Sequence, residues 1–473
     1  MENLLINIKE ITKIYQICFF LRKKICFHLS FRVLQDLLDF LCFITFCAPP
    51  SMFLSFLCST TKKTNDICKY FSPGSCFLLP HGTRVYNKLI EFIKKEYWKR
   101  GYEEVISPNI YNMKLWETSK DAASYKENMF TFDIDKQEFG LKSINGPGHC
   151  LMFEHRVRSY RELPIRLAEF GVLHLNETSE ALSGLTHTRR FQQDDAHIFC
   201  TKEQVKKEVK DVLDFVDYVY TKFGFTYELK LLTRPEENTK DLQRWEESEN
   251  DLVEALQEFG KPFTVNRGEG ALCGPKIDIT LSDAMKRKFQ CASIQLDFQL
   301  PDHFKLRYSP SDEEKKENVM IHSKVLGSED KEKGVRPVMI HRTVLGSFER
   351  MLAILLDHYK GKWPFWISPR QVIVCSSSNN ENHRSYAEEV RRQIHEAGYH
   401  VEVDTTDRNI SEKVGEAEIA QYNYILVVGD EEVATRQVTA LLRDSSCSDR
   451  SKVPMMSVDA LLDVFKLRIV KFL

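Results

Sequence analysis

Apolar residues follow two periodicities in the central part of the chain, and this pattern restricts the possible folds more than any other feature. Two stretches repeat apolar residues at helical spacing, and they end at Gly101 and Gly224. Their apolar positions are Val85, Leu89, Phe92, Ile93 and Tyr97, and then Val205, Val209, Val212, Val216 and Val219. Between them, strand-length runs cover Phe170–Leu175 and Phe191–Phe199, joined by a loop with Gly184. The combination predicts an α+β domain around an antiparallel sheet.

A different pattern begins after Trp363-Pro364. The strand-like runs Val372–Val374 and Tyr424–Gly429 alternate with helical stretches, one of which stops at Gly398. Strands that alternate with helices at this spacing predict an α/β domain with a largely parallel sheet. We therefore expect one domain at residues 68–365 and a second at residues 366–473.

Residues 1–67 have a different character from both domains. Phe40–Thr61 contains no charged residue and is long enough to reach across a bilayer, but Pro49-Pro50 in its middle would kink a helix. Two interpretations are open: a segment that contacts a membrane or directs targeting, and an apolar leader without a function. We leave the segment out of the fold prediction.

Charge and cysteine content restrict the partners and the compartment. The 473 residues carry 66 Lys and Arg against 68 Asp and Glu, so the net charge of −2 gives no bulk attraction to nucleic acid, although a local basic face is compatible with it. The 13 cysteines include no C-x-x-C pair, which argues against a zinc ribbon or a thioredoxin-type site. Scattered cysteines of this kind fit reduced thiols, and we expect a cytoplasmic protein.

One segment occurs twice in the chain. Val319–Ser328 and Val338–Ser347 match at eight of ten positions. Two copies cannot form a solenoid, which needs about three repeats. Because the second copy runs directly into a helical stripe that starts at Phe348, we expect it to be the structural copy and the first to be a local duplication.

The polar clusters, taken one at a time, leave more than one interpretation. Asp194-Asp195 followed by His197 fits a site for a cation or ammonium group, although a satisfied polar cluster at a strand end is the more common explanation. His341, shortly before Arg350 at a helix start, fits a metal ligand beside a phosphate contact. An arginine in a first helical turn is, however, more often solvated or ion-paired.

The order of several segments is far more specific than any one of them. They are Phe77–Arg84 (FLLPHGTR), Gly140–Cys150 (GLKSINGPGHC), Gln192–Phe199 (QQDDAHIF), Gly274–Asp278 (GPKID), Gln295–Pro301 (QLDFQLP) and His341–Arg350 (HRTVLGSFER). In this order the chain resembles threonyl-tRNA synthetases, which are class II aminoacyl-tRNA synthetases, from about Phe71 to Gly429. The resemblance implies a class II catalytic core on an antiparallel sheet, followed by an α/β anticodon-binding domain. It also implies a homodimer that uses threonine, tRNA(Thr) and ATP with Mg²⁺, and it leaves the family's N-terminal editing domains without a counterpart.

The resemblance also assigns roles to individual residues. The positions that match catalytic residues are Arg350, Glu177 and Lys276; those that match ATP-binding residues are Glu177, Phe191, Gln295 and Arg350; and those that match threonine-binding residues are Gln193 and Asp195. His197 and His341 match two of the three ligands of the family's Zn²⁺ ion.

Four positions depart from the family pattern. Gly146 stands where the third zinc ligand is a cysteine, and Leu175 and His187 stand where two arginines contact phosphate. Cys273 replaces an aromatic residue before the GPK segment. The loss of one preorganised donor typically lowers the rate ~10²–10³-fold, so zinc binding is in doubt and catalysis is expected to be impaired.

Two functional hypotheses therefore stand side by side. In the first, the chain is a threonine–tRNA ligase with impaired activation of threonine. In the second, it is a catalytically inactive synthetase-like protein that keeps the fold, the dimer and contacts to tRNA. The segment after Val438, which reads Leu441-Leu442-Arg443-Asp444, lacks the basic strand used against the anticodon, and it fits either a divergent surface or weakened tRNA discrimination.

Overall fold

The computed structural model describes residues 71–119, 126–235, 241–271, 273–283, 286–311, 334–443 and 455–472. The apolar leader at residues 1–67 and the first repeat copy, Val319–Ser328, lie outside these ranges. Within them, no helix has both the length and the apolar character needed to cross a bilayer.

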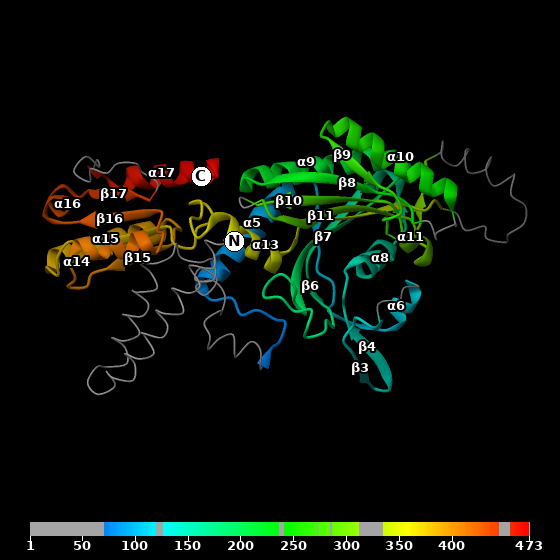
Figure 1. The fold of residues 1–473 in the computed structure, drawn as a ribbon, viewed down its shortest axis with the longest axis horizontal. Coiled ribbons are helices and arrows are strands. Elements are labelled where there is room, and N and C mark those ends of the chain that lie inside the picture. Colours follow the sequence, from blue (N-terminus) through cyan, green and yellow to red (C-terminus); the bar gives the residue numbers. More distant parts are fainter. Residues whose placement is uncertain are drawn as a thin grey trace, which may run out of the picture. The chain divides into compact units, whose positions relative to one another are not determined.

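The larger sheet has eight strands in the order β1-β6-β7-β13-β11-β10-β8-β9 (Figure 1). The strands are β1 (Glu103–Glu104), β6 (Ile165–His174), β7 (Arg190–Cys200), β8 (Thr226–Leu232), β9 (Phe263–Asn266), β10 (Lys276–Ser282), β11 (Lys288–Asp297) and β13 (Val338–Ser347). Every neighbouring pair from β6 to β8 is antiparallel, and only the edge pairs β1–β6 and β8–β9 are parallel. The predicted antiparallel sheet is therefore confirmed. The predicted strand Phe191–Phe199 lies within β7, and Phe170–Leu175 matches the end of β6 except for Leu175, which follows the strand.

One face of this sheet carries the main hydrophobic core. Ala196, Ile198, Ile294 and Ile340 point into it and pack against four helices. These helices are α5 (Pro80–Lys99), α9 (Val205–Phe223), α10 (Leu242–Phe259) and α13 (Phe348–Tyr359). Every apolar residue of the two predicted helical stripes is buried in this core, because a 3.6-residue period keeps one side of a helix facing the sheet.

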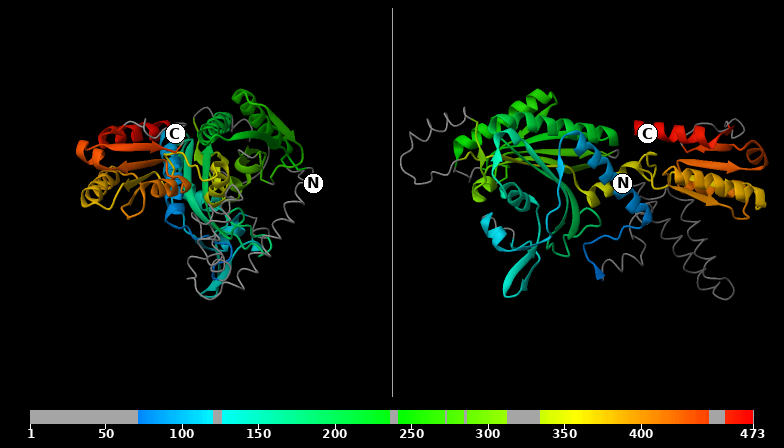
Figure 2. Two further views of the ribbon diagram at one scale, coloured as in Figure 1. Left: turned by 60° about the vertical axis from the view of Figure 1, so that its left-hand side comes forward. Right: turned by 180° about the vertical axis from the view of Figure 1, so that it is seen from behind.

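The opposite face is covered in part by α8 (Gly146–Glu154), and Figures 1 and 2 show α8 across the sheet from α9 and α10. A smaller cluster that includes Phe153, Phe199 and Met339 packs there at one end of the strands. The rest of this face carries polar side chains, which a strand's alternation places opposite the core.

Shorter elements complete the first domain. A three-stranded sheet consists of β2 (Ile110–Asn112), β3 (Thr131–Ile134) and β4 (Gln137–Leu141), and a two-stranded sheet of β5 (Arg158–Ser159) and β12 (Tyr308–Ser309). The short helices are α6 (Lys114–Thr118), α11 (Gln299–His303) and the 3₁₀ turns Tyr160–Glu162 and Lys202–Gln204.

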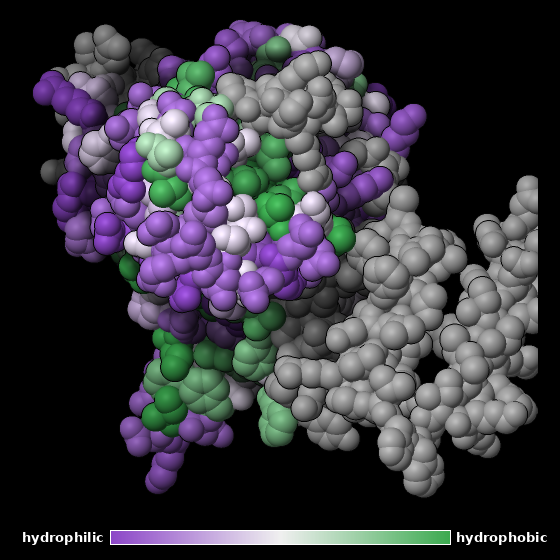
Figure 3. Space-filling model, turned by 90° about the vertical axis from the view of Figure 1, so that its left-hand side faces the viewer, coloured by the Kyte–Doolittle hydropathy of each residue, from purple (hydrophilic) through white to green (hydrophobic). Residues whose placement is uncertain are grey.

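The C-terminal part forms a separate five-stranded sheet in the order β15-β14-β16-β17-β18. Its strands are β14 (Val372–Ser376), β15 (Val401–Asp404), β16 (Tyr424–Val428), β17 (Val438–Leu442) and β18 (Met455–Met456); its helices are α14 (Glu381–Glu396), α15 (Ile410–Ile419), α16 (Asp430–Thr435) and α17 (Val458–Lys471). The first three strands are parallel, as predicted, but β17 and β18 add antiparallel pairs, so the sheet is mixed. Figure 3 shows a mostly hydrophilic surface over this part, with smaller apolar patches.

On the core side of the larger sheet, a buried ion pair joins β7 and β13. Arg342 Nη1 donates to Asp194 Oδ1 over 3.0 Å, and both side chains are 0% exposed. The second oxygen of Asp194 accepts from the amides of Val344 and Leu345, and the Tyr97 hydroxyl of α5 also donates to this carboxylate. One carboxylate thus connects α5, β7 and the irregular end of β13.

We expect Arg342→Met to lower the free energy of unfolding by about 3–5 kcal/mol, because removal of one partner leaves a buried charge without compensation. Chemical denaturation of the full chain measures this loss. Lys466→Ala, which removes an exposed ion pair in α17, serves as the control and should change the same quantity by less than about 0.5 kcal/mol. A loss for Arg342→Met as small as the control's would contradict the structural role given to the pair.

Candidate active site

Four of the predicted site residues form one row across four neighbouring strands. Lys276 of β10 pairs with Gln295 of β11, Gln295 with His341 of β13, and His341 with His197 of β7. Directly opposed residues of antiparallel strands point to the same face. The register therefore brings residues as far apart in sequence as His197 and His341 onto the polar face. On this face Gln295 Nε2 donates to Cys273 Sγ over 2.6 Å.

The predicted substrate residues of β7 lie on the same face. Phe191, Gln193, Asp195 and His197 are separated by two positions each, so their side chains project to one side of the strand. Asp194, between them, projects to the core and forms the ion pair with Arg342. Asp194 is thus a satisfied polar group in the core, and Asp195 lies on the face of the candidate site.

Arg350 enters the site from the first turn of α13, not from a strand. Ser347 caps this helix by accepting from the Arg350 amide over 3.3 Å. Gly346 has φ +69°, and a Cβ there would lie 2.8 Å from the Cys291 carbonyl, so the turn between β13 and α13 requires glycine. The Nε of Arg350 is buried and has no hydrogen-bond partner among the described residues, as expected of a group that awaits an anion.

The loop between β6 and β7 contains Glu177 and two of the departures. Arg189 holds this loop by donating to the Glu177 carbonyl over 2.8 Å. The Leu175 amide donates to the Arg189 carbonyl over 2.9 Å, which extends the β6–β7 ladder by one pair. Leu175 therefore shares the polar face with Glu169, whereas His187 is exposed at the turn of the loop.

Gly146 lies at the position a third metal ligand would need. A Cβ built on Gly146 would be 3.6 Å from His197 Nε2 and 3.4 Å from His341 Cε1. Cys150 cannot substitute for the missing thiolate, because it is buried one turn further along α8 with its sulfur 3.8 Å from Met339 Sδ. The described residues contain no group of three His, Cys, Asp or Glu side chains positioned to hold a metal ion. Two imidazoles without a third donor do not fit the family's tetrahedral zinc.

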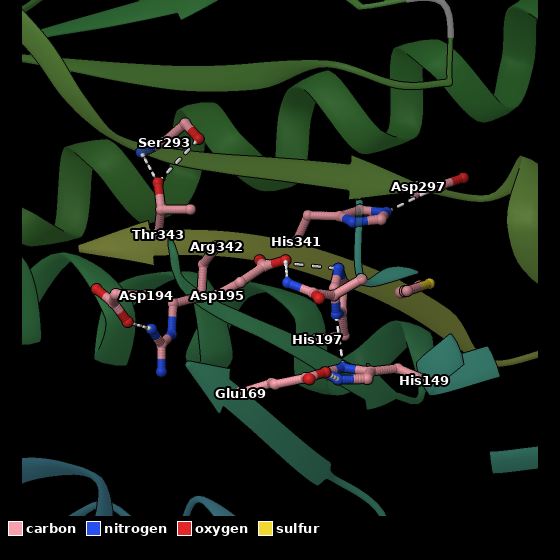
Figure 4. Close-up of polar contacts among 12 residues, drawn as sticks. His149, Glu169, Asp194, Asp195, His197, Ser293, Asp297, His341, Arg342 and Thr343 are labelled. Atoms are coloured by element: carbon pink, nitrogen blue, oxygen red, sulfur yellow. Dashed lines mark hydrogen bonds and ion pairs between the residues drawn. The ribbon is translucent and has the colours of Figure 1, made fainter. Parts of the chain in front are cut away.

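Sequence reasoning missed three residues that support the two imidazoles. His149 Nδ1 lies 2.7 Å from His197 Nδ1, His149 Nε2 lies 3.0 Å from Glu169, and His341 Nε2 lies 2.8 Å from Asp297 (Figure 4). Asp297 could have been found, because it lies two positions after Gln295 in a strand-like segment. His149 and Glu169 could not, since only the fold brings α8 over β6.

The charge of Glu169 is maintained by a dense set of donors. Burial alone would raise the pKa of Glu169, but hydrogen bonds from His149, Lys142 and Ser107 outweigh it and lower that pKa to about 2. Lys142 Nζ lies 2.7 Å from the carboxylate, and both side chains are almost completely buried. Burial also lowers the pKa of His197 and raises that of Asp195, so His197 is neutral at neutral pH.

Because the pKa of Glu169 is depressed in the folded state, its contribution to stability is present above its ordinary pKa of 4.5 and is lost as the pH falls toward 2. We expect the difference in unfolding free energy between the wild-type chain and Glu169→Gln to shrink by roughly 2 kcal/mol from pH 6 to pH 3. Denaturation across this range measures the difference. Glu412→Gln on the exposed side of α15 is the control, and an unchanged difference for Glu169→Gln would exclude an ionised Glu169.

The matches to known families cover most of the described chain. Residues 130–330 match the tRNA synthetase class II core domain (G, H, P, S and T), and residues 371–467 match an anticodon binding domain. The chain is 62% identical over 401 residues to a mitochondrial threonine–tRNA ligase of Arabidopsis thaliana, which covers 85% of this chain and 53% of that protein. It is 50% identical over 373 residues to the cytoplasmic threonine–tRNA ligase of Saccharomyces cerevisiae, which covers 79% of this chain and 48% of that protein. The chain therefore spans about half the length of these relatives.

Two solved structures are similar to this chain over most of their length. The RNA binding domain of threonyl-tRNA synthetase from Cryptosporidium parvum superimposes with a TM-score of 0.77 at 48% identity, over 85% of this chain and 94% of that one. A threonyl-tRNA synthetase from Aeropyrum pernix superimposes with a TM-score of 0.71 at 25% identity, over 86% of this chain and 91% of that one. The chain belongs to the threonyl-tRNA synthetase family of class II aminoacyl-tRNA synthetases.

Proposed function

We propose that the chain is a threonine–tRNA ligase that activates threonine with ATP and transfers it to tRNA(Thr), with an activation step weakened by its departures. The observation that carries this proposal is the row Lys276, Gln295, His341 and His197 across β10, β11, β13 and β7. A row of this kind presents a cation, an amide and two imidazoles to one small ligand. Such convergence of polar groups on one face of a sheet is typical of a substrate site.

The nucleotide is assigned to the half of the site nearest α13. Phe191, which is half-buried, offers its ring for stacking on adenine, and Glu177 and Gln295 offer acceptors and donors to the polar atoms of the base. Arg350 binds the phosphate tail, since its buried guanidinium nitrogen has no partner among the described residues. Class II synthetases use ATP with Mg²⁺, and the ion is expected to arrive on the phosphates, because Mg²⁺ usually keeps substrate oxygens and waters as ligands.

Threonine is assigned to the other half, beside Gln193 and Asp195. Lys276 Nζ lies 3.1 Å from Asp278 Oδ2. The ammonium group of Lys276 stabilises the negative charge that develops during adenylate formation. These groups orient the carboxylate of threonine toward the α-phosphate, so positioning and electrostatics supply the catalysis.

A second candidate function is favoured by Leu175 and Gly146. Both lie on the substrate side of the sheet, and neither side chain can hold a phosphate or a metal. A chain without these groups is also compatible with an inactive synthetase-like protein that keeps tRNA contacts. His187 and Cys273 also favour this alternative, because neither side chain offers the same hydrogen-bond donor as the residue that the family has at that position.

The wider organisation follows from the same assignment. We propose that residues 68–365 are the catalytic core, that residues 366–473 bind the anticodon, and that the chain is a cytoplasmic homodimer. A mitochondrial location is the alternative, since relatives named for both compartments match the chain. Residues 1–67 are left with an unknown role, and membrane contact through them is one of the options.

Threonine-dependent exchange of pyrophosphate into ATP tests the proposal. We expect the wild-type chain to exchange at least about 10²-fold more slowly than a family member with both phosphate arginines. Leu175→Arg should raise the rate by about 10–10²-fold, because it restores a guanidinium on the substrate face. Leu151→Arg adds the same charge at an exposed position of α8 and should leave the rate unchanged. Absence of exchange in every variant would support the inactive alternative.

A further inference from the structure

Three imidazole rings form a column between two carboxylates in the candidate site (Figure 4). The ring centroids of His149 and His197 are 4.7 Å apart and those of His197 and His341 are 4.6 Å apart, with each pair edge to face. Glu169 binds the ring at one end of the column, and Asp297 binds the ring at the other end. The column is intact even though Gly146 provides no metal ligand.

Hydrogen bonds indicate which ring nitrogen carries the proton in His149 and in His197. Glu169 accepts from the Lys142 ammonium and from the hydroxyl and amide of Ser107, so it is an anion and His149 Nε2–H donates to it. His149 is fully buried and its Nε2 faces the Glu169 carboxylate, which Lys142 also contacts, so we assign the remaining nitrogen, Nδ1, as an acceptor. His197 Nδ1–H therefore donates to His149 over 2.7 Å, which leaves a lone pair on His197 Nε2.

The third ring follows the same logic. Asp297 Oδ1 accepts from the amides of Gln299 and Leu300, and its Oδ2 lies 2.8 Å from His341 Nε2. A carboxylate held in this way accepts the His341 Nε2–H, which leaves Nδ1 as the acceptor of the ring.

We propose that His197, His341 and Asp195 bind the ammonium and hydroxyl groups of threonine directly, without a metal ion, and that His149 is the positioning residue that holds the His197 lone pair toward them. This inference rests on the proposed function and names how its amino-acid substrate is recognised. His197 Nε2 lies 3.6 Å from the Cβ position of Gly146 and 3.9 Å from Asp195 Oδ1. It therefore faces the space that a cysteine side chain in place of Gly146 would partly fill.

The charge and hydrogen-bond character of the site select its ligand. Asp195 Oδ2 accepts from Asn145 over 3.0 Å, and its Oδ1 is turned toward His197. Two lone pairs and a carboxylate form a set of acceptors, which is complementary to the three N–H donors of an ammonium group and the donor of a hydroxyl. Valine lacks the hydroxyl and would leave a buried acceptor unpaired, so it should bind about 10–100-fold more weakly than threonine. Serine keeps both groups and should bind within about tenfold of threonine.

Binding without ATP tests the proposal on the full chain. Isothermal titration with L-threonine should give the same Kd, within a factor of two, before treatment with EDTA, after it, and after addition of Zn²⁺. Metal analysis of the wild-type chain should give much less than one zinc per chain. Failure of threonine to bind, or binding that EDTA abolishes and Zn²⁺ restores, overturns the proposal.

The outcome for metal-free threonine binding can be distinguished from the outcome for the proposed ligase activity. Threonine that binds without a metal to a chain with no pyrophosphate exchange supports the recognition mode and refutes the ligase. Exchange that continues in excess Mg²⁺ but stops with the zinc-selective chelator 1,10-phenanthroline supports the ligase and refutes metal-free recognition.

Variants of His149 test its positioning role. His149→Leu removes the acceptor for His197 Nδ1–H and should weaken threonine binding at least tenfold, whereas His149→Gln offers an amide oxygen in its place and should restore most of the affinity. Equal losses in both variants, with unchanged thermal unfolding, would refute the role. The melting temperature separates this result from a general loss of fold.

Variants of Gly146 provide an independent test that does not depend on His149. Gly146→Cys should acquire about one zinc per chain and make threonine binding sensitive to EDTA, because the thiolate would complete the donor set with His197 and His341. Gly146→Ser adds a similar volume without the thiolate and should acquire no zinc. If the two variants hold equal amounts of zinc, the placement of the site at Gly146 is wrong.

Discussion

The carboxylate of Asp194 lies in the core, and it also holds the segment that leads to the candidate site on the opposite face of the sheet. It binds Arg342 on the core side, and it also accepts from the amides at the point where β13 departs from its regular register. That departure leads through Gly346 to the first turn of α13, which carries Arg350. A buried group on one face therefore fixes a nucleotide-binding candidate on the other. Both oxygens of Asp194 are used, whereas Nε and Nη2 of Arg342 have no hydrogen-bond partner among the described residues, and the guanidinium lies over the rings of Tyr97 and Tyr102 instead.

Much of the architecture could be predicted from apolar periodicity. The buried sides of α5 and α9 follow the two stripes of the sequence, and the alternation Phe191, Gln193, Asp195, His197 already places four residues on one face of β7. Registers between strands could not be predicted in this way, because they depend on pairings of distant segments. The row from Lys276 to His197 is one such pairing, and so is the opposition of Glu169 and Asp195. Family resemblance supplied these residues as a set, but only the sheet explains why they converge.

The departures lie at positions where the family resemblance implies ligand contacts, and the residues that support these positions are still present. Gly146 has lost a thiolate, yet His149, Glu169 and Asp297 still orient the two imidazoles. Leu175 has lost a guanidinium, yet its backbone still extends the β6–β7 ladder. Supporting residues of this kind carry their own cost when unpaired, since buried polar groups destabilise a fold unless hydrogen bonds satisfy them.

This distinction bears on how such a site changes chemistry without losing its fold. A ligand residue at the edge of the site can be replaced with little effect on packing: the Cβ position of Gly146 makes only ordinary contacts of 3.4 Å or more. Replacement of Lys142 or Glu169 alone costs stability, because it leaves the other side chain charged and buried. The supports of the imidazole column therefore contribute to the stability of the fold, whichever ligand the column binds. A site that keeps its acceptors and loses its metal remains complementary to donors, and an amino acid brings those donors in its ammonium and hydroxyl groups.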